Sequence, residues 1–280
     1  GCIYCFARPT HAYLGLSPGL DFETRIFFKP EAGRLLRRTL ARPGYRPTTI
    51  ALGANTDPYQ PIERDKRLTR EILEVLAEAR HPVGIVTKSA LVVRDLDLLA
   101  PMAAQGLARV CLSVTTLDRH LARRMEPRAA TPERRLEAMR ALHEGGVPVS
   151  VLTSPMIPGL NDHELEAILE RAVEAGADHA GYILLRLPLE IKDLFREWLE
   201  AHYPDRAERV LSLMRQSRDG QLYDSRWGRR MTGSGPYADL LAQRFGRAVR
   251  RLGLNRRRWD MRLDLFRPPG PDPAQLSLFG

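Results

Sequence analysis

Two cysteines near the amino end carry the clearest chemistry in this sequence. Cys2 and Cys5 are separated only by Ile3 and Tyr4. A turn of two residues can bring both sulfurs to one side, so the pair can bind one metal centre. A thioredoxin-like redox pair would follow a strand, and a structural zinc site would need four ligands, whereas the third cysteine, Cys111, lies in an apolar run. The third possibility is an iron-sulfur cluster held by three cysteines.

The composition favours an enzyme that works in a reducing compartment. The chain has 280 residues, 44% of them hydrophobic, enough for one large α/β domain and an appendage. No apolar run approaches the roughly 18 residues that cross a bilayer, and no signal peptide is visible. Three cysteines do not make a disulfide scaffold. We therefore expect a cytoplasmic monomer without a membrane anchor.

The elements that must position these cysteines alternate along the chain. Apolar, β-branched runs predict buried strands, and apolar residues at helical spacing predict the helices between them. The predicted strands are 24–28, 48–52, 83–86, 110–114, 147–152 and 180–185, and the predicted helices begin near 30, 68, 95, 131, 161, 190, 206 and 237. Asn161 with Glu164 resembles a capping box for one of them. This alternation predicts parallel βαβ units in an open or closed barrel.

Polar residues follow four successive predicted strands. Thr56 and Asp57 follow the predicted strand 48–52, and Lys88 follows 83–86. Ser113 lies near the end of 110–114, and Asn161 lies in the loop after 147–152. Function in such barrels sits at the carboxyl ends of the strands. A zwitterionic ligand needs acceptors for its ammonium group and a cation for its carboxylate, which Asp57 and Lys88 can supply. The alternative is ordinary loop capping by Thr, Asp and Asn.

Several segments together resemble the radical SAM superfamily. Residues 2–6 look like the second half of its CxxxCxxC signature, and 52–63, 86–89 and 155–162 resemble its branch similar to spore photoproduct lyase. The resemblance implies a partial (β/α) barrel with a 4Fe-4S cluster and S-adenosylmethionine at its top. It implies reductive cleavage of that cofactor to a 5′-deoxyadenosyl radical. Because residue 1 is Gly rather than Met, we expect the first cluster cysteine four positions before Cys2, outside this sequence.

The resemblance also assigns cofactor-binding residues. Thr56 matches a hydroxyl near the methionine amino group, and Lys88 matches a basic residue near its carboxylate. Ser113, Arg128 and Asn161 are further candidates for the ribose and the carboxylate. The family pattern therefore agrees with the strand-end positions.

Three positions in the motifs bear on the reaction. Tyr4 is kept as in the family, and we assign it a catalytic role, whereas Phe6 replaces a tyrosine expected after the last cysteine. Ala54 stands where spore photoproduct lyase has the cysteine that donates hydrogen to the product radical. This departure argues against the splitting of thymine dimers itself.

Positive charge is concentrated in the sequence that follows the predicted barrel. Residues 206–267 hold 16 Arg, no Lys and 6 acidic residues, a net charge of +10 against +9 for the whole chain. The run 256–259 interleaves three arginines with Trp259, a pattern suited to phosphate contacts and base stacking. The segment therefore predicts contact with nucleic acid. A solvated helix face or a codon bias toward arginine would give the same count.

The carboxyl end predicts a docking motif. Residues 268–274 are rich in proline and should form an extended tether. Gln275, Leu276, Leu278 and Phe279 resemble the consensus by which bacterial polymerases and repair proteins bind the sliding clamp. The alternative is that these apolar side chains fold back onto the barrel.

These observations predict three regions and one function. Residues 1–186 form the radical SAM partial barrel, 187–267 a mostly helical basic extension, and 268–280 a flexible tail. The chain should be a lyase-like radical SAM enzyme that acts on nucleic acid, as in DNA repair. A radical SAM maturase of a peptide or RNA is an alternative, and so is a non-catalytic DNA-associated adaptor.

Overall fold

A parallel five-stranded sheet forms the centre of the computed structural model, which describes residues 1–270. The strands are β1 (Ile50–Leu52), β2 (Val83–Thr87), β3 (Ala108–Ser113), β4 (Val149–Met156) and β5 (His179–Leu184). They lie in the order β1-β2-β3-β4-β5, and every neighbouring pair is parallel. The predicted α/β fold with a partial barrel is thus confirmed, with the five strands expected from residue 48 onward.

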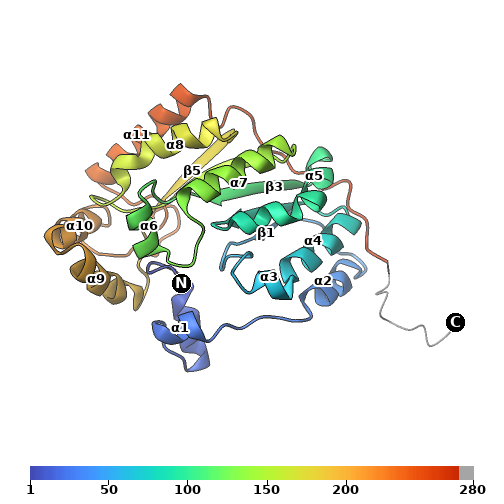
Figure 1. Cartoon of the computed structure of the whole chain (residues 1–280), viewed down its shortest axis with the longest axis horizontal. Coiled ribbons are helices and arrows are strands. Elements are labelled where there is room, and N and C mark those ends of the chain that lie inside the picture. Colours follow the sequence, from blue (N-terminus) through green and yellow to red (C-terminus); the bar gives the residue numbers. More distant parts are fainter. Residues whose placement is uncertain (271–280) are drawn as a thin grey trace.

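Helices cover the sheet and extend beyond it. The α-helices are α1 (Leu20–Thr24), α2 (Ala32–Leu40), α3 (Glu63–Lys66), α4 (Leu68–Glu78), α5 (Leu96–Ala104), α6 (Arg119–Met125), α7 (Pro132–Glu144), α8 (Leu165–Glu174), α9 (Ile191–His202), α10 (Pro204–Gln216) and α11 (Pro236–Leu252). Short 3-10 helices cover Arg8–Leu14, Ala90–Asp95 and Asp162–Glu164. Figure 1 shows α4, α5, α7, α8 and α11 following one another around the sheet, with α9 and α10 beyond them.

The two faces of the sheet differ because successive strand residues point to opposite sides. Val110 and Leu112 of β3 are fully buried in the main hydrophobic core. Arg109 and Cys111, which alternate with them along the strand, are only half-buried and face the other side. Lys88 follows Val86, the register partner of Cys111, by two positions and so lies on that same inner face. The inner face therefore carries the polar side chains toward the carboxyl ends of the strands.

A second hydrophobic cluster joins the cysteine loop to the extension. Tyr4 of the loop belongs to it together with Met125 of α6, Phe195 of α9 and Val210 of α10. Its other members come from the same three helices and from the segments that follow β4 and β5. The extension thus packs directly against the segment that carries the cysteines.

Two local predictions are wrong. Residues 25–28 form no strand, because Ile26, Phe27 and Phe28 are exposed and pair with no neighbour in the sheet. Asn161 does not cap a helix with Glu164; its amide binds backbone groups of the loop instead, and a 3-10 turn precedes α8. Helix α6 was not predicted, since its seven residues are too few to show a helical period.

The last part of the described chain, 255–270, runs across the protein without helix or strand. We call it the strap. The ring of Trp259 packs at a tilt of 42° against His179 at the start of β5, with 3.9 Å between ring centroids. The amide of Arg267 donates to the carbonyl of Ala79 after α4 at 2.9 Å. Among residues 1–270, no helix is long and apolar enough to span a membrane.

Candidate functional site

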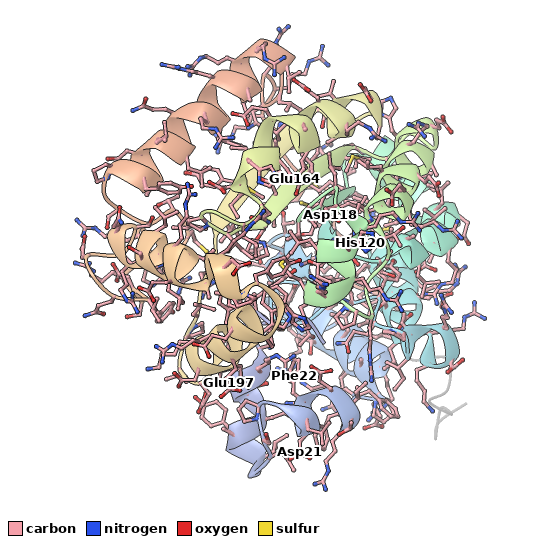
Figure 2. The ribbon with its side chains drawn as sticks, turned by 60° about the vertical axis from the view of Figure 1, so that its left-hand side comes forward. Asp21, Phe22, Asp118, His120, Glu164 and Glu197 are labelled. Atoms are coloured by element: carbon pink, nitrogen blue, oxygen red, sulfur yellow. The ribbon has the colours of Figure 1, made fainter. Side chains whose placement is uncertain are left out.

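The cysteine loop is held in place by backbone hydrogen bonds. The amide of Cys5 donates to the carbonyl of Cys2 at 3.2 Å, and that of Ile3 donates to the carbonyl of Met125 at 3.0 Å. Buried Arg8 donates from Nε to the Cys2 carbonyl at 3.0 Å and lies over the ring of Phe22 in α1 (Figure 2). The loop is therefore fixed between α1 and the end of α6, and both cysteines are free thiols.

Hydrogen bonds at its amino end fix the position of helix α6. Asp118 accepts hydrogen bonds from the amides of His120 and Leu121 at 2.7 and 3.3 Å, which caps the first turn (Figure 2). Just before it, the hydroxyl of Thr116 and the amide of Leu117 donate to Glu164, which lies at the start of α8. These bonds fix α6, and with it the Met125 carbonyl that holds the cysteine loop.

A buried carboxylate lies beneath the loop. Glu126 is 2% exposed and accepts hydrogen bonds from the hydroxyl of Tyr4, the hydroxyl of Thr115 at 2.6 Å and the guanidinium of Arg135. Burial opposes its ionisation, but Arg135 and Lys88 nearby hold the pKa of Glu126 below its usual range. The ionised carboxylate ties the loop to β3 and α7.

Electrostatics at Cys2 depend on this carboxylate. Burial first, and the charge of Glu126 second, raise the pKa of the Cys2 thiol to about 12. The same two causes raise the pKa of Tyr4 well above its ordinary value. Cys2 is therefore a neutral thiol at pH 7 in the protein alone, and a bound metal cation would have to favour its thiolate.

Lys88 places a cation beside the loop on the inner face. Its Nζ lies 5.8 Å from the centroid of the ring of Tyr4. Tyr4 lies between the two cysteines in the sequence. Asp57 orients the turn that carries it, accepting from the Lys88 amide at 2.8 Å and from the Thr87 hydroxyl at 2.6 Å. Both oxygens of Asp57 are thus engaged in the loop, as the capping alternative expects.

The loop after β1 approaches β2 very closely at Gly53. Its φ is +94°, and a Cβ there would lie 2.0 Å from the carbonyl oxygen of Val86. Only glycine fits this position. Thr56 follows in the same loop and is exposed, three residues from the close approach.

The other predicted residues lie apart from this group or serve the backbone. The Asn161 amide accepts from the Ile157 amide at 2.6 Å and donates to the carbonyls of Thr115 and Pro155 at 2.7 and 3.0 Å. Arg128 donates to the Glu23 carbonyl at 3.1 Å on the outside.

Ser113 of β3 is 2% exposed, and its carbonyl accepts from Arg135. The structure thus brings Cys2, Cys5, Tyr4 and Lys88 together and leaves Arg128 outside this group.

Sequence reasoning missed Glu126, Arg135 and Arg8. Arg135 lies in a helix rich in charged residues, where a solvated side chain is the ordinary expectation. It is followed by Leu136, and both face the protein interior. The helical phase of α7 was the one available signal, since positions 135, 136, 139 and 142 share the buried side.

The comparison with known families identifies the superfamily of the chain. The model of the Radical SAM superfamily matches residues 1–172, more than half of the chain. The chain belongs to the radical SAM superfamily. Members typically use a 4Fe-4S cluster and S-adenosylmethionine.

Relatives by sequence do not narrow the reaction. An uncharacterized protein of Mycobacterium tuberculosis is 37% identical over 217 residues, which cover 77% of this chain and 64% of the relative. An uncharacterized protein of Methanocaldococcus jannaschii is 33% identical over 159 residues, 57% of this chain and 58% of its own length. The chain thus spans less than two thirds of these relatives.

Similar solved structures support the fold. Spore photoproduct lyase complexed with dinucleoside spore photoproduct matches with a TM-score of 0.62 at 18% identity, over 90% of this chain and 71% of that chain. A cysteine-to-alanine mutant of that lyase with the same ligand gives a TM-score of 0.59, also at 18% identity and with the same coverage.

The described residues contain only part of what a metal cluster needs. Among residues 1–270, no group of three or more His, Cys, Asp or Glu side chains could hold a metal ion. Cys2 and Cys5 lie together in the cysteine loop, whereas Cys111 lies within β3.

Proposed function

We propose that this chain contains most of the catalytic core of a radical SAM enzyme that acts on nucleic acid. The observation that supports the chemistry is the contact between Lys88 and Tyr4, which places a cation of the sheet's carboxyl edge beside the cysteine loop. Parallel α/β sheets bind their ligands at that edge. The family match supplies the reaction class.

A 4Fe-4S cluster held by Cys2 and Cys5 would supply the electron that cleaves S-adenosylmethionine and yields a 5′-deoxyadenosyl radical. Lys88 would bind the cofactor's carboxylate by a charge-assisted hydrogen bond, and Thr56 would bind its amino group. Glu126 and Arg135 hold Tyr4, and therefore the loop, in position. Tyr4 is buried with its hydroxyl on Glu126, so its direct contribution is to orient the loop.

Two observations support a nucleic-acid substrate. Residues 206–267 carry a net charge of +10, and long-range attraction to phosphates follows from such a surplus. Spore photoproduct lyase, which shares the fold, has been solved with a dinucleoside ligand. Ala54 stands where that family's hydrogen-donating cysteine is expected, so the reaction on the nucleic acid differs from photoproduct splitting or uses another donor.

The test is cofactor cleavage by the protein expressed from its complete gene. After anaerobic reconstitution with iron and sulfide, we expect about four irons per chain. With a strong reductant, 5′-deoxyadenosine should accumulate. Cys2→Ala and Cys5→Ala should abolish its formation, whereas Cys111→Ala, which removes a thiol inside β3, should retain it.

The outcomes separate the alternatives. Stoichiometric zinc without iron, or cleavage that survives Cys5→Ala, would contradict the radical SAM assignment. Cleavage stimulated by a peptide and not by any oligonucleotide would favour the maturase. Binding of DNA by a protein that holds no cluster would favour the adaptor.

A further inference from the structure

The loop between α10 and α11, residues 217–235, is attached to the carboxyl end of β5. The amide of Leu184 donates to the carbonyl of Met231 at 2.8 Å, and the amide of Ser234 donates to that of Ser217 at 2.9 Å. At Gly233 the backbone comes so close to Ser217 that a Cβ would lie 2.8 Å from its carbonyl oxygen. We call this segment the β5 loop. It lies at the edge of the sheet where the cysteine loop also sits.

Three arginines at this junction lack acidic partners. The Nε atoms of Arg186, Arg218 and Arg230 are buried and make no hydrogen bond. Of the ion pairs formed within residues 1–270, none involves these three side chains. Arg218 is 1% exposed, and its guanidinium reaches only the carbonyls of Leu184, Leu185 and Arg230. Removing a cation from water without a counter-charge is costly.

The other deeply buried arginines are paired. Arg8 meets Glu23 at 2.5 Å, and Arg135 meets Glu126. The β5 loop does contain acidic residues, but Arg226 and Arg229 occupy them, since both bind Asp219 and Arg226 also binds Asp224. The cluster of Arg186, Arg218 and Arg230 therefore has a surplus of positive charge. Burial, and then the nearby charge of Arg186, lower the pKa of Arg218, although Asp224 opposes this.

The arginine cluster adjoins the cysteine loop. The guanidinium carbon of Arg186 lies 5.1 Å from the centroid of Phe6, the residue after Cys5. Its Nη1 also meets the sulfur of Met231 in the β5 loop at 3.6 Å. An anion bound by Arg186 would thus sit next to the segment that holds the proposed cluster.

An exposed aromatic ring lies beside the arginine cluster. Trp227 is 84% exposed, and the guanidinium of Arg230 lies over its ring at 3.9 Å. Single exposed apolar side chains are common on protein surfaces, so Trp227 matters here because of the cation that its ring faces. An indole face beside a cation suits the stacking of a nucleobase next to its phosphate.

We propose that Arg186, Arg230 and Trp227 bind a single nucleic-acid strand beside the cysteine loop. The two guanidinium groups take a phosphate, and Trp227 stacks on the adjoining base. Arg218 is a positioning residue, because it holds the end of β5 and adds to the positive potential. A base must be unpaired to expose its face to Trp227, so an unpaired strand should bind better than a duplex. This inference rests on the proposed function and assigns its substrate contacts.

The test is fluorescence anisotropy of a labelled 15-nucleotide single strand with the whole chain, and no cluster or cofactor is needed. Trp227→Ala should weaken binding by roughly 5- to 150-fold, the range for loss of one stacked base. Arg230→Gln and Arg186→Gln should weaken it and should each lower the slope of log K against log salt by about 0.7. The duplex of the same sequence should bind more weakly.

Matched controls remove the same groups elsewhere. Arg140→Gln deletes an exposed charge on α7, outside the basic segment 206–267, and Tyr13→Ala deletes an aromatic residue that is 88% exposed near the amino end. Both should bind as tightly as the wild type. Trp227 lies on the surface, so its variant should fold, which a thermal melt would verify.

Each result has a distinct meaning. If the wild type binds the strand and Trp227→Ala and Arg230→Gln bind equally well, the site is wrong and the nucleic-acid substrate stands. If the wild type binds no strand or duplex, both the site and that substrate are wrong, while cofactor cleavage can still be scored separately. If an acidic peptide displaces the strand and binds more tightly, the site belongs to a protein substrate and the inference is overturned.

Discussion

The Tyr4 hydroxyl is one of three donors to the buried Glu126 carboxylate. Removing this hydroxyl should lower the stability of the protein. Tyr4→Phe leaves the charged acceptor with two donors, Thr115 and Arg135. We expect the free energy of unfolding to fall by about 1–3 kcal/mol, the cost of a missing bond to a buried charge. Urea unfolding measures it, with Tyr13→Phe, whose ring is 88% exposed, as the control. Equal stability of the two variants would show that the Glu126 bond contributes nothing.

Lys88 gives the second prediction at the residue scale. If its ammonium group binds the carboxylate of S-adenosylmethionine, Lys88→Ala should weaken cofactor binding by about 1.5–3 kcal/mol. Lys66→Ala is the matched control, because Lys66 also lies over an aromatic ring, that of Phe28, at 5.0 Å. Calorimetric titration of the reconstituted protein measures both. A Lys88→Ala variant that binds as tightly as the wild type would place the carboxylate elsewhere.

Among the elements, the strap is fixed to the sheet through a buried histidine. His81 is fully buried between α4 and β2, and the ring of Phe266 from the strap meets it edge-on at 5.5 Å. Nδ1 lies 3.1 Å from the Pro82 carbonyl and Nε2 lies 2.9 Å from the Tyr45 hydroxyl. The neutral imidazole satisfies both contacts, donating from Nδ1 and accepting at Nε2. Protonation would remove the acceptor.

The free energy of unfolding should therefore decrease as the pH is lowered, because His81 is buried in its neutral form. Burial lowers its pKa in the folded protein below the unfolded value of about 6.5. The unfolded chain then binds the proton first, so the stabilisation is complete above pH 6.5 and is lost as the pH falls toward the folded pKa. Denaturant unfolding at several pH values should show a shallower fall for His81→Asn. His120→Asn, the same exchange on the surface of α6, is the control, and identical curves for His81→Asn and the wild type would contradict the prediction.

Helices and strands could be predicted from the sequence wherever burial of one side makes apolar residues recur at a regular spacing. The strands at 83–87 and 108–113 and the helices at 68–78 and 132–144 were predicted within a few residues, because each faces the core along one side. The predicted strand at 24–28 failed, since β-branched and aromatic residues there are exposed. A strand needs a partner as well as a propensity, and the sequence shows only the propensity.

The site was predictable only in part for the same reason. The spacing of Cys2 and Cys5 is local and visible, and the motif placed Lys88 beside them. The bond between Tyr4 and Glu126 joins residues 122 positions apart, and nothing in either neighbourhood signals it. Asp57 and Asn161 looked like ligand groups, yet their hydrogen bonds join neighbouring loops: Asp57 accepts from the Lys88 amide after β2, and Asn161 donates to the Thr115 carbonyl after β3.

On the scale of the whole molecule, the two ends of the described chain lie apart. The cysteine loop packs against α6 and the extension, whereas the Gly270 carbonyl accepts a hydrogen bond from Arg37 of α2. Figure 1 shows α2 on the opposite side from α9 and α10. A partner bound by residues after 270 would therefore leave the cysteine loop and the β5 loop accessible.

The predicted sliding-clamp motif, Gln275 with Leu276, Leu278 and Phe279, lies outside the described residues and stays a prediction. Its Gln side chain would form hydrogen bonds on the clamp, and Leu278 and Phe279 would fill an apolar pocket. A proline-rich tether loses little further entropy on binding, so micromolar affinity, about 8 kcal/mol, is expected. The whole chain titrated against a bacterial clamp should bind, and a variant with Gln275, Leu278 and Phe279 changed to Ala should not. Leu263→Ala, in the strap, should bind normally, and equally negligible binding by the wild type and the triple variant would remove the clamp from the list of partners.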